Sequence, residues 1–207
     1  NDNIGDSVGN DTIGAGAGDD TVNGSNGHDT IHGGEGNNRL IGGEGSDYMT
    51  SGAGDDAFDA GHGNNTVNSG DGDDTITAGS GRDTIHAGDG DDIIDGGNGR
   101  DYLTGGNGDD TINGGGGNDY ILASEGNDSI NAGTGHDTVY AGDGDDLVLA
   151  TGPAYYYTVN QIYGMAGNDT LIGGDGDDTI LGGIGDDEIR GRFGNDLLAG
   201  GDGNNRI

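Results

Sequence analysis

The chain has 207 residues, of which 52 are Gly and 28% are hydrophobic, and its 39 acidic residues against 6 basic ones give a formal net charge of -33. This charge argues against binding to nucleic acid or to anionic lipid, and it favours cations as partners. The chain has no Cys, which excludes disulfides, and no apolar run approaches the roughly 18 residues of a membrane helix.

Residues 1–149 form an array with a period of nine residues. The unit is Gly-Gly-x-Gly-x-Asp-x-apolar-x, as in residues 96–104, GGNGRDYLT. Seventeen successive units keep this register, which predicts a repeat architecture. Their sixth position is almost always Asp and forms the column Asp2, Asp11, Asp20, Asp29, Asn38, Asp47, Asp56, Asn65, Asp74, Asp83, Asp92, Asp101, Asp110, Asp119, Asp128, Asp137 and Asp146.

Each unit predicts one turn and one short strand. The Gly two residues before the Asp marks a backbone position that needs a positive φ or a close approach, and the three residues after the Asp place one apolar side chain inward. Two units then make one coil of about 18 residues with two strands. We therefore expect an all-β fold, a parallel β-roll or two-sheet β-solenoid with about 23 short strands around an aliphatic ladder.

The array is interrupted once, over residues 150–163. One irregular repeat survives there, Asn160-Gln161-Ile162-Tyr163, preceded by an enlarged turn that contains Pro153 and the cluster Tyr155-Tyr156-Tyr157. This Tyr-rich turn is either a tolerated surface insertion or a contact site for a partner or another subunit, since exposed aromatic clusters often mark interfaces.

Residues 164–207 resume the period and are expected to continue the same solenoid. The Asp column goes on as Asp169, Asp178, Asp187 and Asp196. Met165 and Arg192 replace the second Gly of their units, so we expect those two turns to be distorted.

This repeat resembles that of the RTX family, the haemolysin-type calcium-binding repeats of secreted bacterial toxins, proteases, lipases, epimerases and adhesins. The resemblance covers nearly the whole chain, and its motif is specific for fold and metal but not for biological role. It implies calcium bound by the Asp column, with backbone carbonyls of the turns completing the ligand set. It also implies type I secretion, and therefore a secreted, extracellular or cell-surface location.

Stacking of the coils explains why calcium suits the column. Asp residues two units apart, such as Asp74 and Asp92, stack at the strand spacing of about 4.7–4.9 Å, where bare carboxylates repel each other. Ca2+ takes oxygen ligands at about 2.3–2.6 Å, so one ion fits between two coils and on the order of 20 ions would neutralise the chain. Mg2+ and zinc fit worse. Asn38 and Asn65 are expected to be weaker ligands through their amide oxygen.

The function that we expect is that of a calcium-binding extracellular structural or adhesive module, disordered without Ca2+ and folded with it. The alternatives are the secretion and folding domain of a larger RTX enzyme or toxin, a self-assembling filament or surface-layer subunit, and an ice-binding face formed by the outward Thr rows. We find no enzyme site. The chain begins and ends within a repeat and shows no capping segment, which favours a larger parent chain or end-to-end homo-oligomers.

Overall fold

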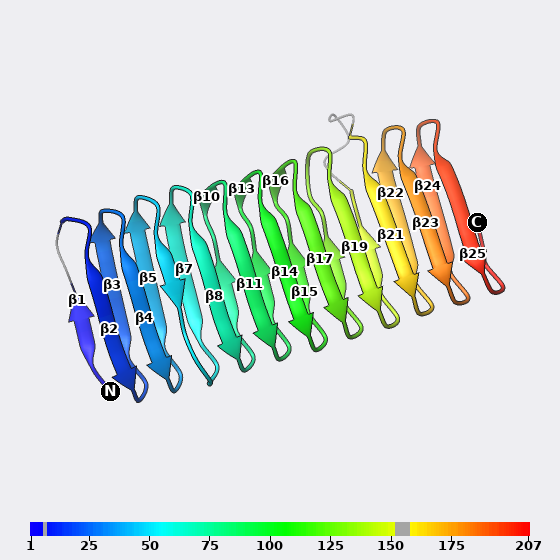
Figure 1. Ribbon diagram of the computed structural model, residues 1–207. Helices are drawn as coiled ribbons and strands as arrows, with labels where there is room; N and C mark the ends of the chain where they lie inside the picture. Colours follow the sequence, from blue (N-terminus) through cyan, green and yellow to red (C-terminus); the bar gives the residue numbers. More distant parts are fainter. Residues whose placement is uncertain (6–7, 152–157) are drawn as a thin grey trace.

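A computed structural model of the chain describes residues 1–5, 8–151 and 158–207, and these residues form a parallel β-solenoid. Coil follows coil along one axis, with the N-terminus at one end of the roll and the C-terminus at the other (Figure 1). Two parallel sheets face each other, and the chain alternates between them. The predicted all-β, two-sheet architecture, in which two nine-residue units form one coil, is confirmed.

The two sheets contain 25 strands in the described residues. The first sheet consists of β1 (Asn3–Gly5), β3 (Thr21–Asn26), β5 (Arg39–Glu44), β7 (Ala57–His62), β9 (Thr75–Thr77), β10 (Ser80–Gly81), β12 (Ile93–Asp95), β13 (Asn98–Gly99), β15 (Thr111–Asn113), β16 (Gly116–Gly117), β18 (Ser129–Asn131), β20 (Leu147–Leu149), β22 (Thr170–Asp175) and β24 (Glu188–Phe193). The second consists of β2 (Thr12–Ala17), β4 (Thr30–Glu35), β6 (Tyr48–Thr50), β8 (Thr66–Asp71), β11 (Thr84–Asp89), β14 (Tyr102–Asn107), β17 (Tyr120–Glu125), β19 (Thr138–Asp143), β21 (Gln161–Ala166), β23 (Thr179–Ile184) and β25 (Leu197–Asp202).

Neighbouring strands pair at a constant offset of two repeat units. Ile85 is the partner of Leu103, for example. Across the interruption the offset is longer, so that Val148 pairs with Leu171, and both sheets continue on the far side. The Tyr-rich turn, Tyr155 to Tyr157 included, lies outside the described residues. The division at residues 149 and 163 stays a prediction.

Many strands are longer than the expected three residues. Fifteen of them have six residues, because pairing with the neighbouring strands continues into the residues that were expected to form the turn. In β11, Gly88 has a φ of 125° and still pairs with Gly106, and Asp89 pairs with Asn107. A left-handed Gly therefore bends the strand without ending it, as at a bulge.

The core is a narrow ladder between the sheets. Its main column is the predicted apolar position, which is buried from Ile13 to Ile189. In the described residues, a second inward column lies five residues before the Asp and holds only small residues, such as Ala87, Ala123 and the buried Ser69. A methyl group built on Gly42 of this column would lie 2.5 Å from Oδ2 of Asp47, so the Asp carboxylates already occupy the space beside it.

Within the described residues there is no helix that is long and apolar enough to cross a membrane.

Candidate metal sites along the two edges of the roll

The Asp column forms two lines, one along each edge of the roll, where the chain turns from one sheet into the other. We call these the first edge and the second edge. The predicted ligands on the first edge are Asp2, Asp20, Asn38, Asp56, Asp74, Asp92, Asp110, Asp128, Asp146, Asp169 and Asp187. Those on the second edge are Asp11, Asp29, Asp47, Asn65, Asp83, Asp101, Asp119, Asp137, Asp178 and Asp196.

These side chains are buried although most are charged. All of the predicted ligands are at most 3% exposed except three near the ends of the roll. Those three are Asp2, which is exposed, and Asp11 and Asp196, which are half-buried. Buried carboxylates are rare unless they are paired or bind a metal, so the burial itself calls for a partner.

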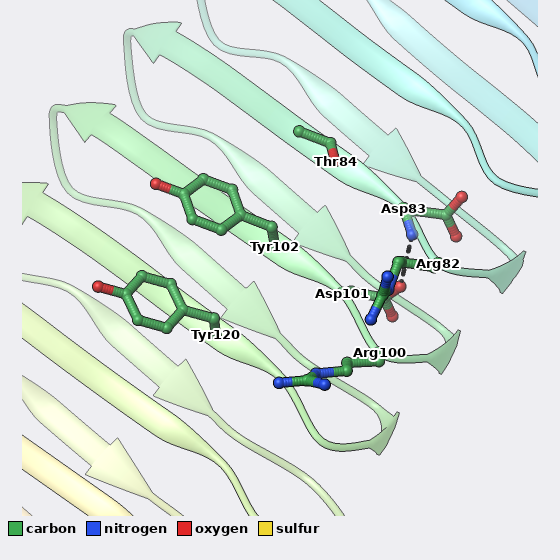
Figure 2. A pocket seen from close by; sticks show the side chains of 7 residues that line it. All are labelled: Arg82, Asp83, Thr84, Arg100, Asp101, Tyr102 and Tyr120. Carbon is green, nitrogen blue, oxygen red and sulfur yellow. Dashed lines mark hydrogen bonds between the residues drawn. The ribbon is translucent and has the colours of Figure 1, made fainter.

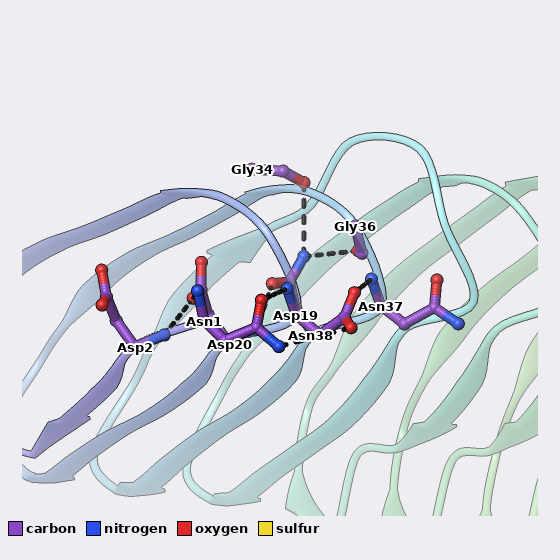
Figure 3. A network of polar contacts seen from close by, with 8 residues as sticks. All are labelled: Asn1, Asp2, Asp19, Asp20, Gly34, Gly36, Asn37 and Asn38. Carbon is purple, nitrogen blue, oxygen red and sulfur yellow. Dashed lines mark hydrogen bonds and ion pairs between the residues drawn. The ribbon is translucent and has the colours of Figure 1, made fainter.

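From Asp20 onward, one oxygen of each carboxylate has a fixed partner in the preceding coil. The backbone N–H of Asp74 donates to Oδ1 of Asp92 at 2.8 Å on the first edge, and the N–H of Asp83 donates to Oδ1 of Asp101 at 2.8 Å on the second edge. Figure 3 shows the start of this series on the first edge, from Asp2 to Asp20 and on to Asn38. Each Oδ1 atom is therefore directed toward the coil before its own.

The other oxygen is buried without a hydrogen bond in sixteen of the aspartates. The sixteen Oδ2 atoms belong to Asp20, Asp29, Asp47, Asp56, Asp74, Asp83, Asp92, Asp101, Asp110, Asp119, Asp128, Asp137, Asp146, Asp169, Asp178 and Asp187. No Arg side chain forms an ion pair with any of them in the part of the chain that the structure describes. A buried polar atom without a partner costs about 1–3 kcal/mol, and more when it is charged, so a cation beside these sixteen atoms would stabilise the fold.

Backbone carbonyls from a second coil face the same point as Oδ2. A methyl group built on Gly24 would lie 2.5 Å from Oδ2 of Asp29 and 3.0 Å from the carbonyl oxygen of Gly42, which belongs to the next coil. The arrangement repeats one coil later, where a methyl group on Gly42 would lie 2.5 Å from Oδ2 of Asp47 and 2.6 Å from the carbonyl oxygen of Ala60. Oxygen atoms of two coils thus converge beside a residue that must be small.

This donor set suits a hard cation. At no point of the described residues do three or more His, Cys, Asp or Glu side chains lie together. An ion on either edge would therefore complete its shell with backbone oxygens or water. Ca2+ prefers such a mixture of carboxylate and carbonyl oxygens and accepts irregular geometry, whereas zinc prefers nitrogen and sulfur. The residues present therefore fit calcium.

Burial shifts the acid–base behaviour of these carboxyl groups. It raises the pKa of Asp92 to about 7, against the hydrogen bond from Asp74, which lowers it, and the charges of neighbouring aspartates raise the pKa further. The same cause raises the pKa to about 7 in Asp110, Asp119 and Asp146, and to about 6 in Asp74, Asp83, Asp128, Asp137, Asp169 and Asp178. Without a cation, these groups thus hold their protons to a higher pH than a free carboxyl group does.

The Gly two residues before each Asp is required by close stacking of the coils. Gly117 has a φ of 135°, and a methyl group on it would overlap the carbonyl oxygen of Gly99. The position four residues before the Asp does not require Gly, because Met165 and Arg192 occupy it with φ of 79° and 76°. Both residues pair in register within β21 and β24, so the expected distortion of those two turns is wrong.

Two arginines lie beside the second edge. Arg82 and Arg100 line a pocket of about 340 Å³ together with Tyr102 and Tyr120, whose rings stack at 5.2 Å (Figure 2). The buried pair Asp83 and Asp101 forms the wall of this pocket, so the two guanidinium groups offset part of the negative charge of this edge.

The first edge also carries an outer row of Asp and Asn that was not predicted from the sequence. It lies one residue before each ligand and is Asp or Asn at every coil, whereas the second edge has residues such as His28, Ser46 and Arg82 there. In the outer row the N–H of Asp91 donates to Oδ1 of Asp73 at 2.9 Å, and the N–H of Asp109 donates to Oδ1 of Asp91 at 2.8 Å. In the sequence this row recurs every two units, so a comparison of single units does not reveal it.

Comparison with known families gives one match that covers nearly the whole chain. A model described as the RTX calcium-binding nonapeptide repeat matches residues 1–31, 32–67, 68–103, 86–121, 95–130, 122–151, 158–189 and 181–207. A search of curated proteins found no match.

Proposed function

The chain belongs to the family of RTX calcium-binding nonapeptide repeats, and from this premise we propose that it is an extracellular structural or adhesive module whose folding is coupled to calcium binding. The coarser part of this statement, a calcium-binding repeat module with a structural repeat fold, follows from the family. The finer part rests on the geometry of the two edges and on the charge of the chain.

The observation that carries the proposal is the set of sixteen buried Oδ2 atoms without a hydrogen bond. An ion beside Asp29 would be held by its Oδ2 and by the carbonyl oxygen of Gly42 from the next coil. In the same way, the aspartates predicted from the sequence are proposed as the ligands along both edges. When bound, calcium supplies positive charge between coils that otherwise repel each other.

The small apolar core and the large negative charge of the roll support the proposed coupling of folding to calcium. The core is one column of medium-sized apolar side chains and one of small residues, while the net charge is -33. Low apolar content and high net charge favour disorder. Ions that bind the folded chain but not the unfolded one stabilise the fold by mass action, by about 2.7 kcal/mol per site at a hundredfold excess over the dissociation constant.

The proposed extracellular location fits the same scheme. RTX repeats are typical of secreted proteins, and a chain that requires calcium to fold stays unfolded where calcium is scarce. Calcium ions are the proposed partners, and the number of about 20 ions stays a prediction. A role as the secretion and folding domain of a larger RTX enzyme or toxin uses the same chemistry and would be distinguished by the rest of a parent chain.

Calcium binding is tested by equilibrium dialysis of the purified chain at saturating Ca2+, with Mg2+ at equal concentration as the control. We expect many calcium ions per chain, on the order of one for each buried aspartate, and far fewer magnesium ions. Fewer than about three calcium ions per chain, or equal uptake of Mg2+, would contradict the proposal.

A further inference from the structure

Asn38 interrupts the row of carboxylates on the first edge, between Asp20 and Asp56. Its Oδ1 accepts the N–H of Asp20 at 3.1 Å, so its amide occupies the same place as an Asp carboxylate. Its Nδ2 donates to the carbonyl oxygen of Gly36 at 2.7 Å and lies 3.4 Å from that of Gly34 and 3.1 Å from Oγ of Ser51 (Figure 3). The amide nitrogen therefore stands where Oδ2 stands in an aspartate.

The orientation of this amide is fixed by its partners. The side toward the preceding coil meets a backbone N–H donor, so it must be the oxygen. The side toward its own turn meets carbonyl oxygens, so it must be the NH2 group. An Asn at this position thus supplies two N–H donors to the oxygens that would otherwise surround a cation.

On the second edge Asn65 makes the same two contacts, and Asn160 makes the first of them. Oδ1 of Asn65 accepts the N–H of Asp47 at 3.0 Å, and its Nδ2 donates to the carbonyl oxygen of Gly63 at 3.3 Å. Oδ1 of Asn160 accepts the N–H of Asp137 at 3.1 Å.

Oxygen atoms of the next coil also lie beside Nδ2 of Asn160. It lies 3.3 Å from the carbonyl oxygen of Gly173 and 3.1 Å from Oδ1 of Asp178. Neither Asn160 nor the other two asparagines has a buried side-chain atom without a partner, whereas sixteen aspartates do.

These contacts give each column residue two separate roles. Its Oδ2 or Nδ2 atom faces its own turn, and its Oδ1 accepts the backbone N–H of the column residue in the preceding coil. Asn keeps the second role, because its amide oxygen is still an acceptor, but it reverses the first from acceptor to donor.

We infer that Asn38 and Asn65 close their own turns without calcium, each by donating amide hydrogens to carbonyl oxygens of the turn from the place where an aspartate carries its unpartnered Oδ2. This inference rests on the proposed function, since it specifies which turns take no ion. It departs from the expectation that Asn38 and Asn65 are weak ligands of their own sites. The rows of ions on both edges are therefore interrupted at fixed coils.

The test is a count of calcium ions per chain by native mass spectrometry at saturating Ca2+, for the whole chain and its variants. Asn38→Asp restores an oxygen to the turn and should add one ion. Asn37→Asp is the matched control: it adds the same charge one residue away, in the exposed outer row where Asp is common, and should leave the count unchanged.

The reciprocal variant covers the case in which Asn38→Asp does not fold. Asp92→Asn should lose one ion, with an unchanged circular dichroism spectrum in calcium, because the amide closes its own turn and its oxygen still serves the coil of Asp74. Asp91→Asn is the control and should lose none.

The outcomes separate the two proposals. If the wild type binds calcium but Asn38→Asp gains no ion, or Asp92→Asn loses none or more than one, the inference about the asparagines is overturned. If the wild type itself binds no calcium, the proposed function is overturned.

Discussion

At the scale of single residues, the two oxygens of each buried Asp carboxylate differ. Oδ1 of Asp92 accepts the N–H of Asp74, while its Oδ2 is buried without a hydrogen bond. The sequence predicts that Asp lies at this position and that calcium suits it. It could not predict the division between the two oxygens, nor the reversed role of Asn38, because both depend on the backbone N–H of the preceding coil.

Binding of protons and of calcium should compete at these carboxyl groups. Because the folded chain raises the pKa of Asp92 to about 7, the group takes up a proton as pH falls toward that value. Without a cation, its burial therefore lowers the stability of the fold progressively as pH rises from the unfolded pKa of 3.8 to about 7, and the loss is complete above that value. We therefore expect the calcium concentration at half-saturation to rise as pH falls from about 8 to about 6.

Calorimetric titration with Ca2+ at the two pH values measures this shift. Protons should be released on binding at the lower pH. An unchanged half-saturation point, without proton release, would show that these carboxyl groups do not hold the ions.

The glycine before each Asp is the second requirement at this scale. Gly117→Ala places a methyl group on the carbonyl oxygen of Gly99 at a φ of 135°, and it should cost roughly 3 kcal/mol or more. Gly116→Ala is the neighbouring control, since its nearest contacts are side-chain oxygens at 3.3 and 3.4 Å. Thermal unfolding in saturating calcium should show a clear loss of stability for Gly117→Ala and a small change for Gly116→Ala; equal effects would contradict the stacking argument.

At the scale of the strands, inward and outward positions alternate with a period of two after each Asp. The apolar ladder and its two-unit register could be read from the sequence, because one residue in nine is apolar at a constant place. The length of the strands could not, because Gly88 continues the ladder with a φ that usually ends a strand. The second inward column of small residues was also missed, since Gly, Ala and Ser there look like turn residues.

The strand β12 offers a direct test of the ladder, because Ile93 and Ile94 are adjacent and face opposite ways. Ile94 is 1% exposed and Ile93 is 53% exposed. Ile94→Ala should destabilise the calcium-bound roll by about 2–4 kcal/mol, and Ile93→Ala by roughly 0.5 kcal/mol or less. Unfolding by denaturant in saturating calcium compares them, and a cost that is equal for both would mean that the ladder is not the core.

At the scale of the whole molecule, the roll is a stack in which each coil contacts only its neighbours. Its stability therefore depends on the interfaces between coils, and buried carboxylates lie at those interfaces along both edges. The two edges differ, because the first carries the outer row of Asp and Asn while the second carries Arg82 and Arg100. This difference can be seen in the sequence only when alternate units are compared with each other.

The central claim is that calcium between the coils holds this fold together, and circular dichroism across a calcium titration tests it most directly. In excess chelator at neutral pH we predict the spectrum of a disordered chain, and addition of Ca2+ should produce a cooperative gain of β signal that Mg2+ does not reproduce. A β spectrum that persists in excess chelator, with the same thermal unfolding as in calcium, would contradict the account.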